Sequence, residues 1–441
     1  MTHRLKSAPK AEGIHRTVHP EQTLERVRPL MAQIGVTRLA DITGLDRLGI
    51  PTWSAVVPRS RDILSVYNGK GATHIRAKVG AIMEAAERHA GLHYQREFLR
   101  GAYNELSKQR RVLAPAQSGI PLHPHYMDDA HILWTEGHCL YTGEPVLVPA
   151  ELAGYNIEGV DTRCYAVTTS NGLASGNTYE EAVAHALCEL IERDAWTLAE
   201  VLAHWLPRAR FERQRAQQGL PPVQATPEGE QPFFDDGERF PVIDLSLVQG
   251  PILDVMGQFE AAGLPLHVRD ITSDFGIPTV VASVTEQVSP DMPRAHLGVG
   301  THPDARAAIL RAMTEAAQAR VVDIQGVRED MSTAEEETHH YMAHAKRVAK
   351  INKRSWIHMD AQHKRALSEM PTYDHRDVLD DIRLMLSRLK SAGVEQVIEV
   401  DITHPGTRIP VTRVIVPELE NWAAIHGRIG KRAANAWRAN I

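Results

Sequence analysis

The stretch that decides the fold is Thr178–Glu200, TYEEAVAHALCELIERDAWTLAE, which follows SNGLASGN at 170–177. Its spacing predicts a helix in which Glu189, Glu192 and Arg193 lie three and four residues apart and share one face. The opposite face is apolar and can be buried; it carries Leu187, Leu190, Ile191 and Ala195. Two carboxylates about 4 Å apart repel by about 4 kcal/mol in an effective dielectric of about 20. We therefore expect a positive partner between them, either Arg193 alone or a divalent cation that carries nucleotide phosphates.

The same arrangement of residues occurs twice more in the chain. The upstream copy, GKGATHIRAKVGAIMEAAERHAG at 69–91, has Glu84, Glu87 and Arg88. The downstream copy, GVGTHPDARAAILRAMTEAAQAR at 298–320, has Glu315, Gln318 and Arg320. In each copy a glycine precedes a threonine at or near the predicted helix start, and the pairs are Gly71 with Thr73, Gly176 with Thr178, and Gly300 with Thr301. Three helices with acid or amide groups at matching depths indicate the walls of one charged site.

The starts of these helices carry further signals. Thr178 with Glu181 predicts a capping box. The segment before the first helix, Asn68-Gly69-Lys70-Gly71, resembles a turn that holds phosphate, because glycines let backbone N–H groups approach an anion and lysine supplies charge. Its spacing does not match the Walker A motif, so this signal is weak when taken alone.

Bulk composition narrows the class of protein. The chain has 441 residues, 43% of them apolar and 24% charged, with a formal net charge of −6, and these values are typical of a globular protein. The mixed charge gives no electrostatic case for nucleic acid or an acidic membrane. The three cysteines form no CxxC pair, so neither a disulfide framework nor a thiolate zinc site is predicted. With no apolar run of about 18 residues and no apolar N-terminal stretch, we expect a cytoplasmic protein without a membrane span.

Histidine is abundant, with 23 in the chain. One group comprises His123, His125, His131 and His138, next to Cys139, and another comprises His339, His340 and His344. The pair His340 and His344 has the helical spacing of a metal chelate. Scattered surface histidines remain the simpler interpretation.

A threefold internal repeat runs through the chain. Each copy reads helix, glycine, strand, Asp-Ile-Thr, turn, Ile-Pro, strand, and the triplets begin at Asp41, Asp270 and Asp401. In the first copy the predicted strands are 37–42 and 51–57, after a helix at 19–33. The repetition argues against independent short domains. The Asp and Thr side chains are interpreted as acceptors for backbone donors in the turn, and a catalytic role for the aspartates is the alternative.

Outside the repeats, three segments are predicted to lie at the periphery of the fold. Residues 1–13 are polar and are expected to be flexible. Residues 205–240, rich in Arg, Gln, Pro and Glu, are expected to form a surface insertion. Residues 421–441 form a basic tail that is predicted to contain a short helix packed by Trp422 and Trp437. These boundaries leave 14–420 as one large catalytic domain.

Taken together, the motifs resemble those of the YcaO superfamily of ATP-dependent enzymes that activate backbone amides of peptides. The resemblance extends from DITGLDRLGIP, at 41–51, to 411–418 and covers nearly the whole chain. The family's signature of a small residue followed by ExxER matches Gly80 with Glu84, Glu87 and Arg88, although most members have serine at the position of Gly80. The remaining matches are Lys70, Asn171 within Ser170-Asn171-Gly172, Glu189, Glu192, Arg193, Glu315, Gln318 and Arg320.

The resemblance implies a mixed α/β (α+β) fold with repeated helix–strand–turn–strand units and ATP between acid-bearing helices. It implies ATP and Mg²⁺ as cofactors, with the metal held by Glu84, Glu87, Glu189 and Glu192. The remaining ATP contacts would come from Lys70, Asn171, Arg193, Glu315, Gln318 and Arg320. The reaction implied is phosphorylation of a peptide amide oxygen, followed by attack of a nucleophile on the amide carbon.

The resemblance is greatest to the branch that works beside a TfuA protein, in which sulfide is the nucleophile and the product is a thioamide. The stretch TRLADITGLDRLGIP at 37–51 carries this likeness, and the sequence ends at Trp437–Ile441 without the proline-rich tail of many azoline-forming members. Expected partners are a ribosomally made precursor peptide or protein, a TfuA-like protein and a second copy of the chain in a homodimer. The alternatives are a cyclodehydratase that makes azolines and a non-catalytic scaffold with a YcaO-like fold.

Overall fold

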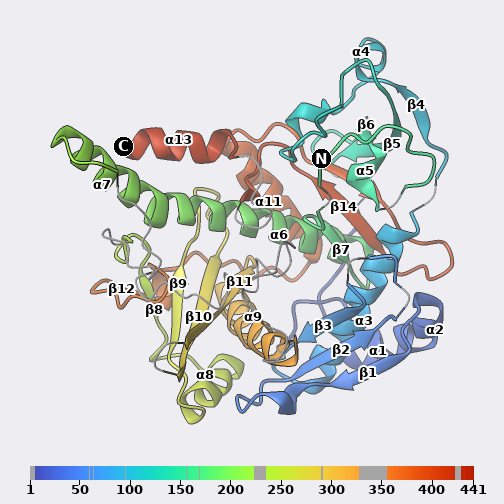
Figure 1. Ribbon diagram of the computed structural model, residues 1–441. Coiled ribbons are helices and arrows are strands. Elements are labelled where there is room, and N and C mark those ends of the chain that lie inside the picture. Colours follow the sequence, from blue (N-terminus) through green and yellow to red (C-terminus); the bar gives the residue numbers. More distant parts are fainter. Residues whose placement is uncertain are drawn as a thin grey trace.

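Three β-sheets and a set of surrounding helices make up the computed structural model (Figure 1). It describes residues 5–58, 60–62, 64–94, 96–155, 157–167, 169–222, 235–289, 292–326, 355–422 and 429–441. The first sheet has the order β1-β2-β3, made by Arg38–Asp41, Thr52–Val56 and Val66–Lys70. The mixed α/β (α+β) architecture expected from the sequence is confirmed.

The second sheet has the order β11-β10-β9-β8-β12. Its strands are Met292–Thr301, Thr279–Ser289, Leu266–Asp270, Val242–Asp244 and Lys364–Ala366. The third sheet has the order β4-β5-β13-β14-β7, and β6 pairs with β5 off this path. Its strands are Leu99–Ala102, His131–Cys139, Ile398–Asp401, Val411–Ile415 and Leu173–Ser175, with β6 at Pro145–Pro149.

Long helices connect and cover these sheets (Figure 1). The central ones are α3 (His74–Leu92), α6 (Tyr179–Glu200) and α9 (Ala305–Gly326). The others are α1 (Pro20–Val27), α2 (Met31–Ile34), α4 (Tyr103–Leu106), α5 (Ala150–Ala153), α7 (Leu206–Gln217), α8 (Pro251–Ala261), α11 (Val378–Ser391) and α13 (Lys431–Asn440). No helix in the described part of the chain is both long and apolar enough to cross a membrane.

The internal repeat is visible as three equivalent hairpins, β1–β2, β9–β10 and β13–β14. In each, Asp Oδ1 accepts the backbone N–H of the Thr two residues later, at 3.0 Å for Thr43, 2.9 Å for Thr272 and 2.9 Å for Thr403. The threonine Oγ1 then accepts a backbone N–H of the following strand at 3.0 to 3.1 Å. The interpretation of Asp and Thr as turn acceptors is therefore confirmed.

Each hairpin pairs with a third strand that leads into a central helix. β3 leads into α3 and β11 into α9, while β7 pairs with β14 and leads into α6, although β7 comes earlier in the sequence than its hairpin. Glycines allow the strands to approach the helices: a Cβ added to Gly69 or Gly298 would lie 2.1 Å from a helix carbonyl oxygen. The repeat therefore delivers α3, α6 and α9 to equivalent positions.

The apolar residues form two main cores. The larger one joins α3, α6 and α11 to the first and third sheets, and includes Ile82, Leu187, Ile191, Met385 and Val400. The second lies between α8, α9 and the second sheet and includes Phe259, Val280 and Ile309. The apolar face predicted for α6 is buried, since Leu187, Leu190, Ile191 and Ala195 are each at most 8% exposed.

Residues 5–13 differ from the expectation of a flexible segment. Leu5 and Ala8 are buried, the Ala8 backbone N–H donates to Asp377 Oδ1 at 2.8 Å, and Lys10 Nζ lies 2.7 Å from Asp381 Oδ2. Polar composition predicts exposure, but it does not reveal the acids of α11 that lie opposite this segment.

Other local predictions are confirmed in part. The helix expected at 19–33 is interrupted by a 3₁₀ turn that contains Pro29, because proline lacks an N–H donor. Thr178 caps α6 by accepting the N–H of Glu181 at 3.2 Å, but Glu181 accepts the N–H of Asn177 rather than that of Thr178. Only half of the predicted capping box is therefore present.

The peripheral segments contain more helix than the composition suggested. Within 205–240, α7 continues α6 through a π-helical stretch at Val201–Trp205, and 223–234 fall outside the described residues. In the C-terminal segment, α13 is held by buried Ala433 and by Arg432, whose Nε lies 2.9 Å from Asp194 Oδ1. The tail helix is confirmed, and an ion pair contributes to its anchoring.

Candidate functional site

Helices α3, α6 and α9 meet around a cavity of about 610 Å³. Each helix supplies polar side chains to its wall: Glu84 and Glu87 from α3, Glu181 and His185 from α6, and Arg311 and Gln318 from α9. Strand β3 adds Asn68, Gly69 and Lys70. The predicted convergence of three charged helices on one site is what the fold produces.

Among the motif carboxylates of α3 and α6, Glu87 and Glu192 are buried, Glu84 and Glu189 are half-buried, and Glu87 and Glu189 accept hydrogen bonds from backbone donors. Ser175 N–H donates to Glu87 Oε2 at 3.0 Å, and Gly172 N–H donates to Glu189 Oε2 at 3.3 Å. Glu87 is 7% exposed and Glu192 is 4% exposed. The helix–strand packing thus fixes these acids at the edge of the cavity with few partners of their own.

Burial raises the pKa of Glu87 well above its usual value, and the charges of Glu84 and Glu189 raise it further. Burial also raises the pKa of Glu189 and lifts that of Glu192 to about 7, against the opposing charge of Arg193. Glu189 and Glu192 are absent from the cavity lining, and the charges of Glu84 and Glu315, respectively, help to raise their pKa values. The site is a cluster of acids that repel one another and that a cation would stabilise.

Arg193 is the internal counter-charge of α6. Its Nη2 lies 3.6 Å from Glu189 Oε1 and its Nη1 lies 3.7 Å from Glu192 Oε1. Arg88 plays a similar part on α3, with Nε 3.2 Å from Glu84 Oε1. Both arginines therefore pair with the acids of their own motif.

Helix α9 contributes one acid that is already neutralised. Glu315 Oε2 lies 2.5 Å from Lys70 Nζ, and this lysine is the leading cause that lowers the pKa of Glu315 against the effect of burial. Gln318 Nε2 donates to the backbone oxygen of Asn68 at 3.0 Å. The predicted nucleotide residues Lys70, Glu315 and Gln318 thus form one hydrogen-bonded link between β3 and α9.

Arg320 lies elsewhere. Its Nε lies 2.7 Å from Asp46 Oδ2 and its Nη1 lies 2.5 Å from Glu286 Oε2, and the side chain is 5% exposed. Arg320 does not line the cavity. The structure therefore separates Arg320 from the other residues that the sequence grouped with it, and uses it to join three segments of the chain.

Several buried donors near the cavity have no acceptor. They are Asn171 Nδ2, Arg193 Nε and Arg311 Nε, each almost fully shielded from solvent. Buried polar groups in native proteins are normally paired, so these donors fit a bound oxyanion such as a nucleotide phosphate. The cluster therefore has the two features expected for a metal–nucleotide complex, which are acids that repel one another and donors that lack an acceptor.

Within the described residues, no three His, Cys, Asp or Glu side chains come together closely enough to hold a metal ion by themselves. Mg²⁺ usually keeps several waters and is bound by one or two carboxylates together with substrate phosphates. The acids of α3 and α6 fit that pattern. Of the histidines grouped in the sequence, His125 and His131 are exposed and His123 and His138 are half-buried, while His339, His340 and His344 lie outside the described residues.

The sequence interpretation missed several residues of the cavity wall. Residues 13–16 of the N-terminal segment line it, together with His185, His302 and Arg311. His185 and Arg311 lie four residues before Glu189 and Glu315, so helical spacing alone places each on the face of its motif. The contribution of residues 13–16 has no comparable signal, because it depends on long-range contacts such as Thr17 Oγ1 to Glu181 Oε1 at 2.7 Å.

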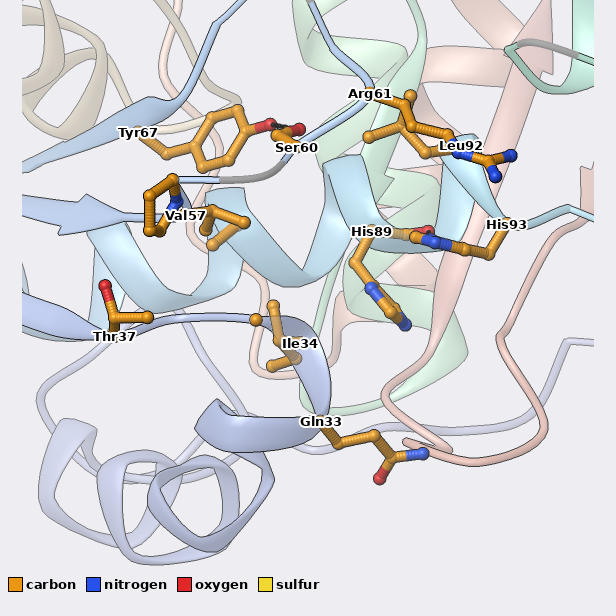
Figure 2. Close-up of a pocket in the computed structure, with 13 residues that line it drawn as sticks. Gln33, Ile34, Thr37, Val57, Ser60, Arg61, Tyr67, His89, Leu92 and His93 are labelled. Carbon is orange, nitrogen blue, oxygen red and sulfur yellow. Dashed lines mark hydrogen bonds between the residues drawn. The ribbon is translucent and has the colours of Figure 1, made fainter.

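A second cavity of about 580 Å³ borders the C-terminal half of α3 (Figure 2). His89 and His93 point toward it from α3, and Ile34, Val57 and Tyr67 come from the first repeat unit. Burial lowers the pKa of His89 to about 4. The predicted site residues are absent from its lining, so this cavity is distinct from the charged site.

A comparison with protein families identifies the class. Residues 68–420 match the model of the YcaO family, described as YcaO cyclodehydratases that bind ATP and Mg²⁺. The chain belongs to this family. The expectation of ATP and Mg²⁺ is thereby confirmed for the family, and peptide-modifying cyclodehydratase chemistry is the activity that the family description gives.

Two curated proteins are similar to this chain over nearly its whole length. An uncharacterised protein of Methanothermobacter thermautotrophicus is 34% identical over 94% of this chain and 97% of its own length. A protein of Rhizobium leguminosarum bv. trifolii, described as lying in the tfuA 3′ region, is 30% identical over 96% of this chain and 93% of its own length.

Solved structures show the same fold. YcaO from Methanopyrus kandleri, bound with AMPPCP and Mg²⁺, superposes with a TM-score of 0.67 at 25% identity, covering 97% of this chain and 98% of that one. A heterocyclase in complex with substrate and cofactor gives a TM-score of 0.73 at 23% identity and covers 95% of this chain. The present chain spans only 54% of that heterocyclase, about half its length.

Proposed function

We propose that this protein uses ATP and Mg²⁺ to convert a backbone amide of a ribosomally made peptide into a thioamide. The γ-phosphoryl group would pass to the amide oxygen as its bond to ADP breaks. Sulfide would then form the new carbon–sulfur bond while the carbon–oxygen bond breaks and phosphate leaves with the electron pair. The observation that carries the proposal is the cluster of mutually repelling acids, together with donors that lack an acceptor, contributed by α3, α6, α9 and the segment before α6.

The residues present suit a phosphoryl transfer. Glu84, Glu87, Glu189 and Glu192 would hold the metal, which would neutralise phosphate charge. The raised pKa values of the last three mark acids that lack sufficient counter-charge, and a divalent cation would supply that charge. The donors of Asn171 and Arg193 would bind phosphate oxygens, and Lys70 with Glu315 and Gln318 would fix the cavity wall.

The choice of sulfide as nucleophile has a narrower basis. It rests on the TRLADITGLDRLGIP stretch and on the Rhizobium relative, whose description places it beside tfuA. A TfuA-like partner is therefore part of the proposal. The second candidate function is azoline formation, which the family description as cyclodehydratases favours.

A direct test distinguishes the two products. The protein is incubated with ATP, Mg²⁺, sulfide and a precursor peptide, with and without a TfuA-like protein, and the peptide is analysed by mass spectrometry. Replacement of one oxygen by sulfur is the expected result. Loss of one water would instead identify azoline formation, and an unmodified peptide together with no peptide-dependent ATP turnover would contradict both.

The metal assignment has its own test. Isothermal titration of the protein with Mg²⁺ and a non-hydrolysable ATP analogue is compared for the native chain and the Glu87→Gln variant. We expect weaker binding in the variant, because one metal-facing carboxylate is lost while its hydrogen bond to Ser175 N–H is kept. Equal affinity for the Mg²⁺ complex would remove Glu87 from the metal site.

A further inference from the structure

His185 is a half-buried imidazole on the cavity wall, and the proposed function assigns it no role. It lies on α6 one turn after Glu181 and one turn before Glu189, and it lines the cavity together with Arg311 of α9. Arg311 Nη2 lies 3.5 Å from His185 Nδ1. A guanidinium group only donates hydrogen bonds, so His185 Nδ1 is the acceptor of this contact.

The contact with Arg311 fixes the tautomer of the ring. A neutral imidazole has one N–H and one acceptor nitrogen, so a proton excluded from Nδ1 resides on Nε2. Among the described residues, no protein acceptor pairs with Nε2 of His185. The ring therefore presents an N–H donor that is available to a ligand in the cavity.

The surroundings keep this ring neutral. Burial lowers the pKa of His185 well below its usual value, and basic groups from four segments lower it further: Arg311 from α9, Arg16 from the N-terminal segment, Lys70 from β3 and His302 from the loop after β11. The proton on Nε2 is then held by a neutral ring, which is a poor acid and has no free lone pair to act as a base. Hydrogen-bond donation is the chemistry that remains.

A neighbouring donor supports an oxyanion as the ligand. Arg311 Nε is shielded from solvent and has no acceptor, and it belongs to the side chain that orients His185. Two side chains with donors that lack protein acceptors thus lie beside each other in the cavity lining. Donors arranged in advance at the position where charge develops are a large source of catalytic stabilisation.

We propose that His185 is a catalytic residue that donates a hydrogen bond from neutral Nε2–H to the phosphoryl oxygens during transfer and departure, with Arg311 as the positioning residue that fixes its tautomer. This inference rests on the proposed phosphoryl transfer but not on the identity of the nucleophile. His185 keeps its proton throughout: the P–O bond to ADP breaks, the P–O bond to the amide oxygen forms, and the later C–O bond breaks without any proton passing to or from the ring.

The test compares His185→Gln, His185→Phe and a matched control, His89→Gln, in the second cavity on α3. Gln keeps an N–H donor, whereas Phe keeps the ring shape without one. Removing a donor of this kind costs about 100-fold to 1,000-fold in kcat, so we expect such a loss of peptide-dependent phosphate release in the Phe variant. The His185→Gln variant should have a rate within about 10-fold of the native rate. The control variant, His89→Gln, should have the native rate.

Two results would overturn the proposal: a Gln variant as inactive as the Phe variant, which would require proton transfer by the imidazole, or native rates in both. Affinity for the ATP analogue should change little, since the effect concerns the reaction step. Phosphate release is the readout, so formation of an azoline in place of a thioamide by the native protein would reject the sulfide step and leave this test intact.

A spectroscopic measurement covers the case in which a variant fails to fold. In ¹⁵N-histidine-labelled native protein, the His185 signals should show a neutral ring with the proton on Nε2 between pH 6 and 8, a range that spans the ordinary histidine pKa of about 6.5. Assignment uses the loss of these signals in the Gln or Phe variant. A charged ring or a proton on Nδ1 would contradict the proposed tautomer.

Discussion

Helices α6 and α9 carry similar motifs and use them in different ways. On α6, Glu189, Glu192 and Arg193 all belong to the charged site formed with α3 and α9, and the arginine lies beside both acids. On α9, Glu315 and Gln318 face that region, but Arg320 pairs with Asp46 and Glu286 on another side. The spacing explains the difference: a residue five positions later lies about 140° around the helix, whereas three or four positions return to the same face.

The arginine of the motif therefore differs in function between the two helices: on α6 it pairs with the acids of the site, whereas on α9 it stabilises the fold. Two helices contribute pairs of acids that need a cation. The third contributes one acid, neutralised by Lys70, and a buried arginine that joins Asp46, in the turn between β1 and β2, and Glu286 of β10 to α9. Variants of the motif acids on α6 should therefore change activity, whereas variants of Arg320 on α9 should change stability.

The largest effect is expected on α6. Glu189→Gln should abolish peptide-dependent ATP turnover, because the amide keeps the hydrogen bond from Gly172 N–H but cannot bind the metal as an anion. The matched control is Glu180→Gln on the same helix, where the carboxylate accepts the N–H of Lys6 at 2.8 Å, outside the cavity lining. The measurement is phosphate release with saturating peptide, and native turnover in Glu189→Gln would remove this residue from the metal site.

The next effect is on stability and belongs to α9. Arg320→Met should lower the free energy of unfolding by about 3–5 kcal/mol, because it leaves the buried Asp46 carboxylate without its partner. Urea denaturation measures the loss, and nucleotide affinity of the folded variant should stay near that of the native chain. The double variant Arg320→Met, Asp46→Asn should recover part of the loss. A selective loss of nucleotide binding with unchanged stability would instead place Arg320 in the site.

The ionisation of Glu192 is expected to make the free energy of unfolding depend on pH, by an amount similar to the effect of Arg320→Met. Its folded-state pKa is raised from the ordinary 4.5 to about 7, so the folded protein binds this proton more tightly than the unfolded chain does. The contribution of this group to the free energy of unfolding is therefore highest below about pH 4.5. It decreases by roughly 3 kcal/mol in total as the pH rises to about 7, and it is constant at higher pH.

The measurement is the urea midpoint of the ligand-free protein between pH 5 and 8, for the native chain and for Glu192→Gln. The difference between the two curves isolates this group from other titrating side chains. Mg²⁺ with an ATP analogue should reduce the difference, since the cation favours the ionised carboxylate. Parallel curves for the two proteins would show that Glu192 titrates normally.

The smallest effect is expected at the helix starts. Thr178→Ala removes the side-chain cap of α6, and Thr73→Ala removes that of α3. Each should lower the free energy of unfolding by about 1 kcal/mol, the usual value of such a cap. Turnover per folded molecule should be unchanged in both. A larger loss of turnover than of stability would mean that these threonines also act in the site.

Much of the site can be predicted from the spacing of residues along each helix, but this spacing does not predict the position of every side chain. Glu84, Glu87, Glu189 and Glu192 were found because intervals of three and four residues fix a face in any helix. Arg320 was grouped with Glu315 and Gln318 because this segment resembles the other two copies of the motif, but a separation of five residues from Glu315 does not return it to the same face. His185 and Arg311 lie four residues before Glu189 and Glu315, so the same spacing argument would predict them as site residues.

The sequence by itself determined the three hairpins with their Asp-Ile-Thr turns and the acid faces of α3 and α6, since these depend on intervals of a few residues and on turn chemistry. Only the tertiary structure decided that β7 pairs with β14 and that residues 5–16 pack against α11 and the cavity. The tertiary structure also gives the acids their raised pKa values. These features arise between segments hundreds of residues apart, where burial and the charge of a distant side chain have no trace in local sequence.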